Sequence, residues 1–492
     1  MPLFVSGPQN TTGVFIQDVP PPASITPTGT GVAVVVGQPL WGPANKLTYP
    51  TSPAAFDATF APPGSVRTGS FHLATTRSAW PVLGCVRAID PAAVASTVNV
   101  LQSATTLATI TAPYPGTLGN SIVWTIGAAG DGNANHFKLT GSLTGASGTT
   151  TEVYDNLNVS GTGANVLPNL ANSTLAVTFA FVATGIPTAG NITMSGGTNG
   201  TTTAAHYVGT PGGSTFGFSL LESDQTINHV WCDDMGNSFR PTVNAGLFAH
   251  VELTTDRVGW INGPSGQSAA SAQTDVASYR SLRLVYNDPW VNVNDDTTGA
   301  SRLIPSGSFG ASVAAQTPPS LSIGYRALNG LYSGIISLEA DRGSARGQNT
   351  AAGISTLIKA PGGGISYEVD CNTSLLSGQT DLTRTRLGQY IGRSVQQSWQ
   401  PFVNAPNVPF FQQPIIDSLD AFLANLLNNA KINPAALPII SAYALSSIAG
   451  TNTPFSISQG QFIVGAQILT SSQMKQIILA MSYGPGLTIT VS

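Results

Sequence analysis

Residues 227–253 read INHVWCDDMGNSFRPTVNAGLFAHVEL, and this stretch decides the fold class that the sequence predicts. Its first six residues form a short apolar run that ends in acidic residues, which is typical of a buried strand. The apolar period then changes, and four apolar residues fall four positions apart on one helical face: Phe239, Val243, Leu247 and Val251. The stretch therefore predicts a strand followed by a helix.

The neighbouring segments extend this alternation. Short apolar runs at residues 31–37, 82–89, 258–261 and 282–286 predict further strands, and residues 54–60 predict a short helix. Alternation of strands and helices indicates a parallel or mixed α/β sheet.

The composition changes between residues 98 and 204, where Thr, Ser, Gly and Asn surround short alternating runs such as SIVWTI at 121–126. This pattern predicts an all-β domain inserted into the α/β core. The predicted fold class is thus α+β or α/β and multidomain, with extended β-arms at both ends. The expected division of the chain is an arm at 1–22, core at 23–97, the inserted outer domain at 98–204, core at 205–365, a C-terminal inner α/β domain at 366–484 and an arm at 485–492.

Each end of the chain carries a strand with no neighbour in the sequence to pair with. The N-terminal run GVFIQDV, with Val14, Phe15, Ile16 and Val19, precedes three prolines, and the C-terminal run alternates Leu487, Ile489 and Val491 with polar residues. Soluble monomers avoid unpaired strand edges, whereas a subunit of a polymer can add such a strand to a neighbour's sheet. We therefore expect self-assembly through these inter-subunit arms.

The C-terminal third predicts two helices, one of which begins at Ser471 or Ser472 as its cap and runs through Met481. Pro414 is expected to open the other, with apolar residues along a single stripe. Asp417 and Asp420 in its first half and Lys431 after its end suit the helix dipole. This helix is a candidate contact surface for another component, and a core helix is an equally good interpretation.

Charge and cysteine content restrict the function. Only 9% of residues are charged and the net charge is −4, without any Lys/Arg run, so no direct nucleic-acid binding is expected. No apolar segment is long enough to span a membrane, and the first residues lack the features of a signal peptide, which indicates synthesis in a cytoplasm. Cys85, Cys232 and Cys371 predict buried thiols, although disulfides between subunits remain an alternative.

Residue types that could support catalysis or bind metal occur without a convincing pattern. His229 and Cys232 precede Asp233 and Asp234, but His229 and Cys232 lie on a predicted core strand with no second pair at ligand spacing. Asp288, Asp295 and Asp296 lie in sequences typical of turns. We expect no catalytic residue, no metal and no cofactor.

Four stretches resemble the contractile tail sheath family of myophages and R-type pyocins. They are residues 13–43, with the arm, the first strand and Trp41-Gly42-Pro43; residues 110–123 with 152–157; residues 195–209; and VYNDPWVNVNDDTTGASRLIPS at 285–306, followed by the strand at 362–369. The family's usual Tyr-Pro-Trp is replaced here by Asn-Asp-Pro-Trp, and its charges are fewer, so individual ion pairs are not carried over.

This resemblance implies a structural, non-enzymatic subunit of a virion tail, assembled in the host cytoplasm. It implies hexameric rings stacked around a tail tube, contraction that drives the tube during genome delivery, and baseplate and tail terminator proteins as further partners. The helix with Asp417, Asp420 and Lys431 would then face the tube. The alternative is a β-rich capsid or receptor-binding protein of a virion, which the α/β pattern and the two terminal strands disfavour. A hydrolase would need a triad or a metal site that the sequence does not display.

Deletion of residues 485–492 tests the C-terminal arm. The truncated chain should fold but fail to form long cylinders, because it lacks the strand that it would add to a neighbouring copy. Circular dichroism would check folding and negative-stain microscopy would check assembly. Normal cylinders from the truncated chain would contradict the role of the arm.

Overall fold

The structure is a computed structural model that describes residues 24–61, 80–145, 148–158, 170, 172–213, 215–233, 235–295, 299–324, 335–359, 364–403, 407, 409–432, 439–446, 452–453 and 459–470. Contacts divide the chain into two units. One is Thr28–Gly392, and the other combines Met1–Pro27 with Arg393–Ser492.

The larger unit contains a mixed sheet of eight strands in the order β18-β17-β13-β12-β11-β1-β3-β2. The six inner strands are parallel: β1 (Val32–Gly37), β3 (Val82–Arg87), β11 (His229–Cys232), β12 (Val258–Asn262), β13 (Leu284–Asp288) and β17 (Ile354–Lys359). Short antiparallel strands, β2 (Leu47–Thr48) and β18 (Ile365–Tyr367), form the two edges. The predicted mixed α/β sheet is confirmed.

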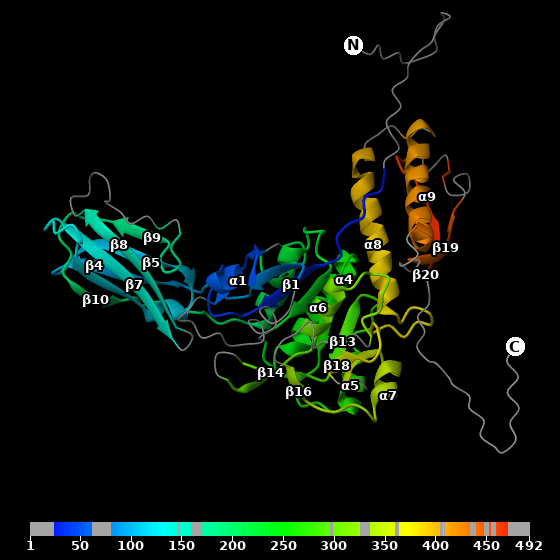
Figure 1. The fold of residues 1–492 in the computed structure, drawn as a ribbon, viewed down its shortest axis with the longest axis horizontal. Coiled ribbons are helices and arrows are strands. Elements are labelled where there is room, and N and C mark those ends of the chain that lie inside the picture. Colours follow the sequence, from blue (N-terminus) through cyan, green and yellow to red (C-terminus); the bar gives the residue numbers. More distant parts are fainter. Residues whose placement is uncertain are drawn as a thin grey trace, which may run out of the picture. The chain divides into compact units, whose positions relative to one another are not determined.

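Both faces of this sheet are buried. In β1, Ala33 and Val35 belong to one apolar core, and Val34 and Val36 belong to the other. The first core also contains α1 (Pro53–Phe60) and α6 (Gly307–Gln316). The second contains α3 (Ala204–Val208), α4 (Arg240–Thr254) and α5 (Ala269–Val276), and Figure 1 shows these helices around the sheet.

Other short elements of this unit surround the sheet. A three-stranded sheet joins β14 (Val291–Asn294) to β15 (Ser301–Ile304) and β16 (Ile335–Leu338). The remaining helical segments are η2 (Gly217–Leu221) and α7 (Arg346–Ala351).

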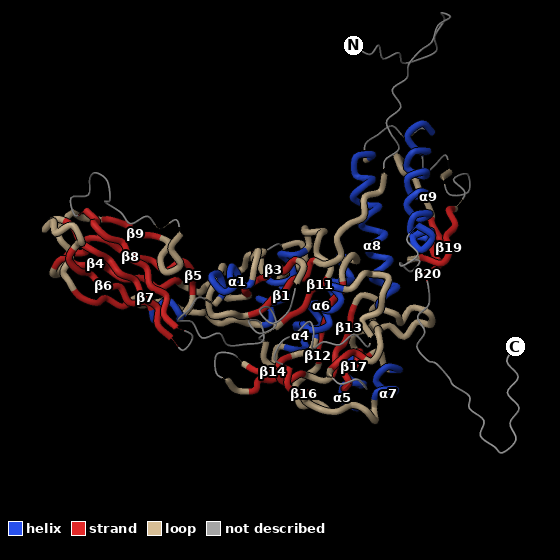
Figure 2. Tube along the Cα trace, viewed as in Figure 1, coloured by secondary structure: helices blue, strands red, loops and turns tan. Residues whose placement is uncertain are grey.

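The segment between β3 and α3 is built of strands, as Figure 2 shows in red. One sheet contains β4 (Ala95–Gln102), β5 (Thr105–Pro115) and β9 (Thr178–Phe181). The other contains β6 (Ile122–Ala128), β7 (His136–Gly145), β8 (Gly148–Asn158) and β10 (Gly190–Thr193), and η1 (Thr117–Ser121) lies between β5 and β6. Inward residues of both sheets, such as Ile110 and Trp124, share one apolar core. The exact boundaries at 98 and 204 stay a prediction, as does the finer division of the chain.

The smaller unit contains helix α9 (Pro409–Ile432) and a two-stranded sheet of β19 (Ile440–Leu445) and β20 (Ala466–Thr470). Helix α8 (Leu382–Trp399), followed by η4 (Gln400–Phe402), contributes residues to both units. The prediction that Pro414 opens the helix is wrong, because α9 begins at Pro409 and Pro414 lies inside it. A proline removes one backbone donor, and the helix that continues from Pro414 to Ile432 offsets that local loss. The helix expected after Ser471 lies outside the described residues.

No helix among the described residues has both the length and the apolar character needed to cross a membrane.

Arg87, the last residue of β3, ties the α/β core to the β-rich segment. Its guanidinium is 1% exposed and donates to the carbonyl oxygens of Pro39, Gly42 and Pro115 at 2.9 Å and of Leu40 at 3.2 Å. Burial lowers the pKa of Arg87 to about 10, so the side chain remains charged at neutral pH. The Arg87 side chain therefore donates hydrogen bonds to three carbonyl groups of the loop at residues 39–42 and to one at the end of β5.

Replacing this side chain should destabilise the larger unit. Arg87→Leu leaves four buried carbonyl groups without their donor, and we expect the free energy of unfolding to fall by about 3 kcal/mol or more. Urea denaturation followed by tryptophan fluorescence would measure the loss, and hydrogen exchange should show lost protection near Pro115. Arg346→Leu is the control, because the Arg346 side chain is 52% exposed. Equal effects of the two substitutions would contradict the role of Arg87.

Candidate functional site

The predicted inter-subunit arms lie outside the described residues. This applies to all seven side chains, Val14, Phe15, Ile16, Val19, Leu487, Ile489 and Val491. Just after the N-terminal arm, Thr26 donates its backbone N–H to Ser398 Oγ of α8 at 2.9 Å. Strand exchange by the arms therefore stays a prediction.

Helix α9 has an apolar face and an acidic face. Leu419, Phe422, Leu423 and Leu426 are buried, whereas the side chains of Asp417 and Asp420 are exposed. The apolar stripe of α9 is therefore part of a core, in agreement with the core-helix interpretation.

The two carboxylates of α9 make local contacts. Asp417 Oδ1 accepts from Gln413 Nε2 at 2.7 Å, and Asp420 Oδ1 accepts from the Tyr443 hydroxyl at 2.8 Å. The prediction that Lys431 follows the end of the helix is wrong, because α9 continues to Ile432 and contains Lys431, whose side chain lies outside the described residues. The role of these three residues against a tube stays a prediction.

The sheet of β19 and β20 is small and poorly covered. Every residue of β20 is at least partly exposed, and the apolar Leu469 is 62% exposed. A two-stranded sheet is marginally stable on its own, since independent stability needs three or more strands or packing against a helix. Here one strand packs, because Ile440 is buried and Tyr443 reaches Asp420 of α9. Among the described residues, this sheet therefore has two strands, of which β20 is largely open to solvent.

The residues that suggested metal binding or catalysis have structural partners. His229 is buried in β11 and its Nδ1 accepts from Trp260 Nε1 at 3.3 Å. Within the described part of the chain, no three His, Cys, Asp or Glu side chains gather as metal ligands.

Asp288 differs from the turn residue that the sequence predicts, because it ends β13. Asp288 is 1% exposed and forms an ion pair with Arg342, whose Nε lies 2.7 Å from its Oδ2. Asp295 does lie in a turn, between β14 and β15, where its carbonyl oxygen accepts from the Gly299 N–H at 2.7 Å. Its carboxylate is buried, with Arg302 Nε at 3.6 Å from Oδ2. Asp296 lies outside the described residues.

The three cysteines are buried thiols that form no disulfide within the chain, as predicted. Burial raises the pKa of the Cys85 thiol, which disfavours the reactive thiolate. Disulfides between subunits would require these side chains to leave the core.

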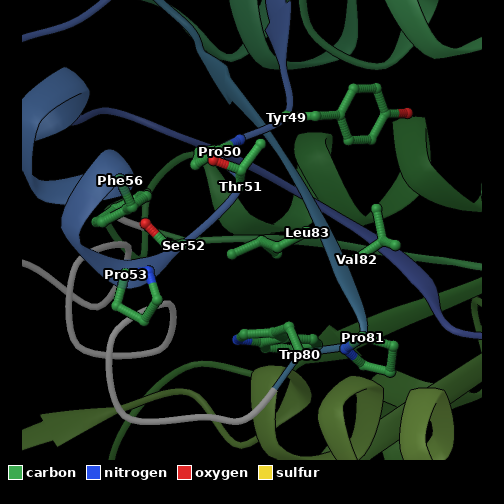
Figure 3. Close-up of a pocket in the computed structure, with 10 residues that line it drawn as sticks. All are labelled: Tyr49, Pro50, Thr51, Ser52, Pro53, Phe56, Trp80, Pro81, Val82 and Leu83. Atoms are coloured by element: carbon green, nitrogen blue, oxygen red, sulfur yellow. The ribbon is translucent and has the colours of Figure 1, made fainter.

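A surface cavity of about 340 Å³ lies beside α1 and the start of β3. Figure 3 shows its aromatic and proline-rich lining, in which Trp80, Phe56 and Leu83 surround the hollow. Trp80 stacks on Trp231 at 4.8 Å between ring centroids, which fixes that wall. The Tyr49 hydroxyl donates to Asp224 at 2.6 Å, and burial raises its pKa further, so it cannot act as a base. None of the described residues that line this cavity carries a carboxylate, an imidazole or a thiol.

Comparison with known proteins finds similarity in fold. No family profile matches the sequence, and no curated protein matches it. A sheath tail protein from Listeria innocua has a TM-score of 0.59 at 13% identity, covering 90% of this chain and 96% of that chain. A chain of the anti-feeding prophage helical sheath in its contracted state has a TM-score of 0.58 at 14% identity, covering 96% and 99%. A chain in the six-fold symmetrised baseplate of the same prophage has a TM-score of 0.56 at 14% identity, covering 97% and 99%. The chain therefore has the fold of contractile tail sheath proteins over nearly its whole length.

His250 makes stability depend on pH. This residue of α4 is 5% exposed and packs near Phe218, and burial, assisted by the charge of Arg257, lowers its pKa to about 3. In the unfolded chain the pKa of a histidine is about 6.5. The stability that the neutral His250 side chain contributes is therefore complete above pH 6.5, and it is lost as the pH falls toward 3. We expect this residue to remove about 2 kcal/mol of unfolding free energy between pH 7.5 and pH 5.

Urea denaturation of the wild type and of His250→Phe at both pH values would measure this contribution. The variant should lose that part of the pH dependence. Phe218→Leu, the matched control at the ring contact, should lower stability at both pH values and keep the slope. If the unfolding free energy of His250→Phe changed with pH as much as that of the wild type, other groups would be responsible for the pH dependence.

Proposed function

We propose that this chain is the repeating subunit of a contractile sheath, which polymerises as stacked hexameric rings around a tail tube. The observation that carries the proposal is the shared fold, which extends over 90% of this chain for one sheath tail protein and 96% for another sheath chain. The role is structural and requires no catalytic site.

The alternative, a β-rich capsid or receptor-binding protein, receives less support. Strands dominate only the segment from β4 to β10, whereas a parallel sheet with helices on both faces forms the core. Parallel sheets of this kind belong to α/β proteins, and capsid proteins of the jelly-roll type have antiparallel strands.

Subunits would be joined by strand exchange through the terminal arms. The sheet of β19 and β20 is the proposed acceptor, since it has two strands among the described residues and an exposed apolar side chain at Leu469. An arm with Leu487, Ile489 and Val491 would extend that sheet by backbone hydrogen bonds and cover apolar surface.

Energetics explains how weak arms can hold a strong lattice. About four hydrogen bonds at roughly 0.5–1.5 kcal/mol each give one arm about 2–6 kcal/mol. Every subunit would both give and receive arms, so the high effective concentration within the lattice makes the connected whole far more stable than one contact. Head-to-tail contacts that do not close into a ring continue as a helical filament.

Contraction would be a change between two packings of the same subunits. The exchanged arms would keep neighbours connected while the folded bodies slide and rotate. New interface formed in the compact packing would drive the change, and a kinetic barrier would hold the extended packing until a baseplate triggers it. No nucleotide is needed for such a switch.

The proposed partners are other copies of this chain, a tail tube protein, a baseplate and a tail terminator. The acidic face of α9, with Asp417 and Asp420, is the proposed tube contact, and Lys431 belongs to the same helix. In a virion tail, contraction would drive the tube through the host envelope for genome delivery, and assembly would take place in the host cytoplasm.

A charge on β20 tests the acceptor role of this sheet. Leu469→Lys changes an exposed side chain, so the subunit should fold normally, but the charge would oppose the addition of an apolar strand. We expect negative-stain microscopy to show single rings or short stacks in place of long cylinders.

Val182→Lys is the matched control, because Val182 in the β-rich segment is 64% exposed. It should assemble as the wild type does. Long cylinders from Leu469→Lys would contradict the proposed role of this sheet as the acceptor of an arm. A wild-type chain that forms no cylinder or ring under any condition would contradict the sheath function itself.

A further inference from the structure

A second cavity, of about 250 Å³, lies between α4 and α5 at the carboxyl end of the parallel sheet. Asn244 fixes its position there, because Asn244 Nδ2 donates to the carbonyl oxygen of Asn262, the last residue of β12, at 2.9 Å. Open α/β sheets bind ligands outside the carboxyl ends of their strands. The cavity therefore lies at this edge of the sheet, between the two crossover helices that follow β11 and β12.

The floor of the cavity is buried and its rim is exposed. Arg240 and Asn244 are each 2% exposed, whereas Pro241 and Ser271 are accessible to solvent. The remaining lining residues are Pro264, Gln267, Asp275 and Tyr279. A small molecule could thus enter from solvent and reach a buried guanidinium.

Arg240 has unused hydrogen-bonding capacity. Its Nη2 donates to the Met235 carbonyl oxygen at 3.4 Å, and neither Nε nor Nη1 has a partner among the described residues. A guanidinium carries five N–H donors, so most of them are unpaired in a place where each unpaired donor is costly.

The orientation of Arg240 is fixed. Its Cζ lies 4.7 Å from the ring centroid of Trp290, and Trp290 Nε1 donates to the Gly263 carbonyl oxygen at 3.0 Å. Stacking covers the flat face of a guanidinium and leaves its N–H edges available. Those edges can bind a carboxylate through two parallel hydrogen bonds.

Nearby acidic groups restrict which anion fits. Burial lowers the pKa of Arg240, and the negative charges of Asp233 and Asp275 counteract that effect, so both carboxylates act on the guanidinium. They would repel a doubly charged phosphate. Asp275, which already accepts from the Tyr286 hydroxyl at 2.7 Å, would instead attract a ligand that carries a donor or a positive charge.

We infer that this cavity binds a small carboxylate that also bears a hydrogen-bond donor, of the class of free amino acids. The carboxylate would bind the N–H edges of Arg240, and the ammonium group would bind near Asp275. Asn244 Oδ1, which has no partner among the described residues, supplies a second acceptor for that donor. The cavity is several times larger than the roughly 30 Å³ that one water occupies in the liquid.

Calorimetric titration of the full chain with free glycine, acetate and inorganic phosphate tests this inference. Glycine should bind at least tenfold more tightly than acetate, and phosphate should not bind. Arg240→Met should weaken glycine binding at least 100-fold. Arg346→Met, which changes an exposed arginine outside the cavity lining, should leave glycine binding unchanged.

Ser271→Trp is a second variant that leaves the buried floor intact and fills the exposed rim. It should abolish glycine binding in a chain that still folds. Three outcomes would each overturn the inference. They are glycine binding to Ser271→Trp as tight as to the wild type, no binding of any of the three probes to the wild type, and a structure with water alone against Arg240. The titration uses the unassembled chain, so its outcome does not depend on sheath formation.

Discussion

The constraint on which this structure depends is that both faces of the parallel sheet must be removed from water. Successive residues of β1, from Ala33 to Val36, point to opposite faces and are all fully buried. Parallel strands also need long crossover connections, which are usually helices. The parallel strands therefore require helices on both faces of the sheet. The cavity between α4 and α5 lies where two of these crossover helices begin.

The order of the strands explains where the β-rich segment could be inserted. β3 and β11 lie on opposite sides of β1, so the chain between them must cross the sheet. A crossover lies outside the sheet and can be lengthened without disturbing a strand. Bridges from Val94 to Thr198 and from Thr97 to Ser195 close the base of the insertion, and Arg87 joins that base to the core. These contacts connect the β-rich segment, a sandwich of two sheets, to the α/β core at its base.

Local patterns in the sequence predict the parts of the structure that local physics controls. The four-residue spacing that begins at Phe239 predicts α4, and the apolar runs predict β1 and β3, since burial on both faces leaves no polar alternation. Asp288 could not be understood in this way, because Arg342, which is far away in the sequence, makes it a buried ion pair. Arg240 was missed for the same reason. An arginine beside a helix start normally suggests a solvated side chain, and only the Trp290 ring and the neighbouring helix give it a buried cavity.

The distribution of cations bears on how the surface behaves. The chain has 19 Lys and Arg residues, and among those that the structure describes six arginines are buried: Arg87, Arg240, Arg257, Arg342, Arg386 and Arg393. Several donate to backbone carbonyls, as Arg87 does to four and Arg386 does to those of Ala314, Thr317 and Leu321. The surface therefore carries even fewer cations than the composition suggests. Mutual repulsion between copies is correspondingly weak, and phosphate neutralisation is poor, so this surface favours packing against protein over contact with nucleic acid.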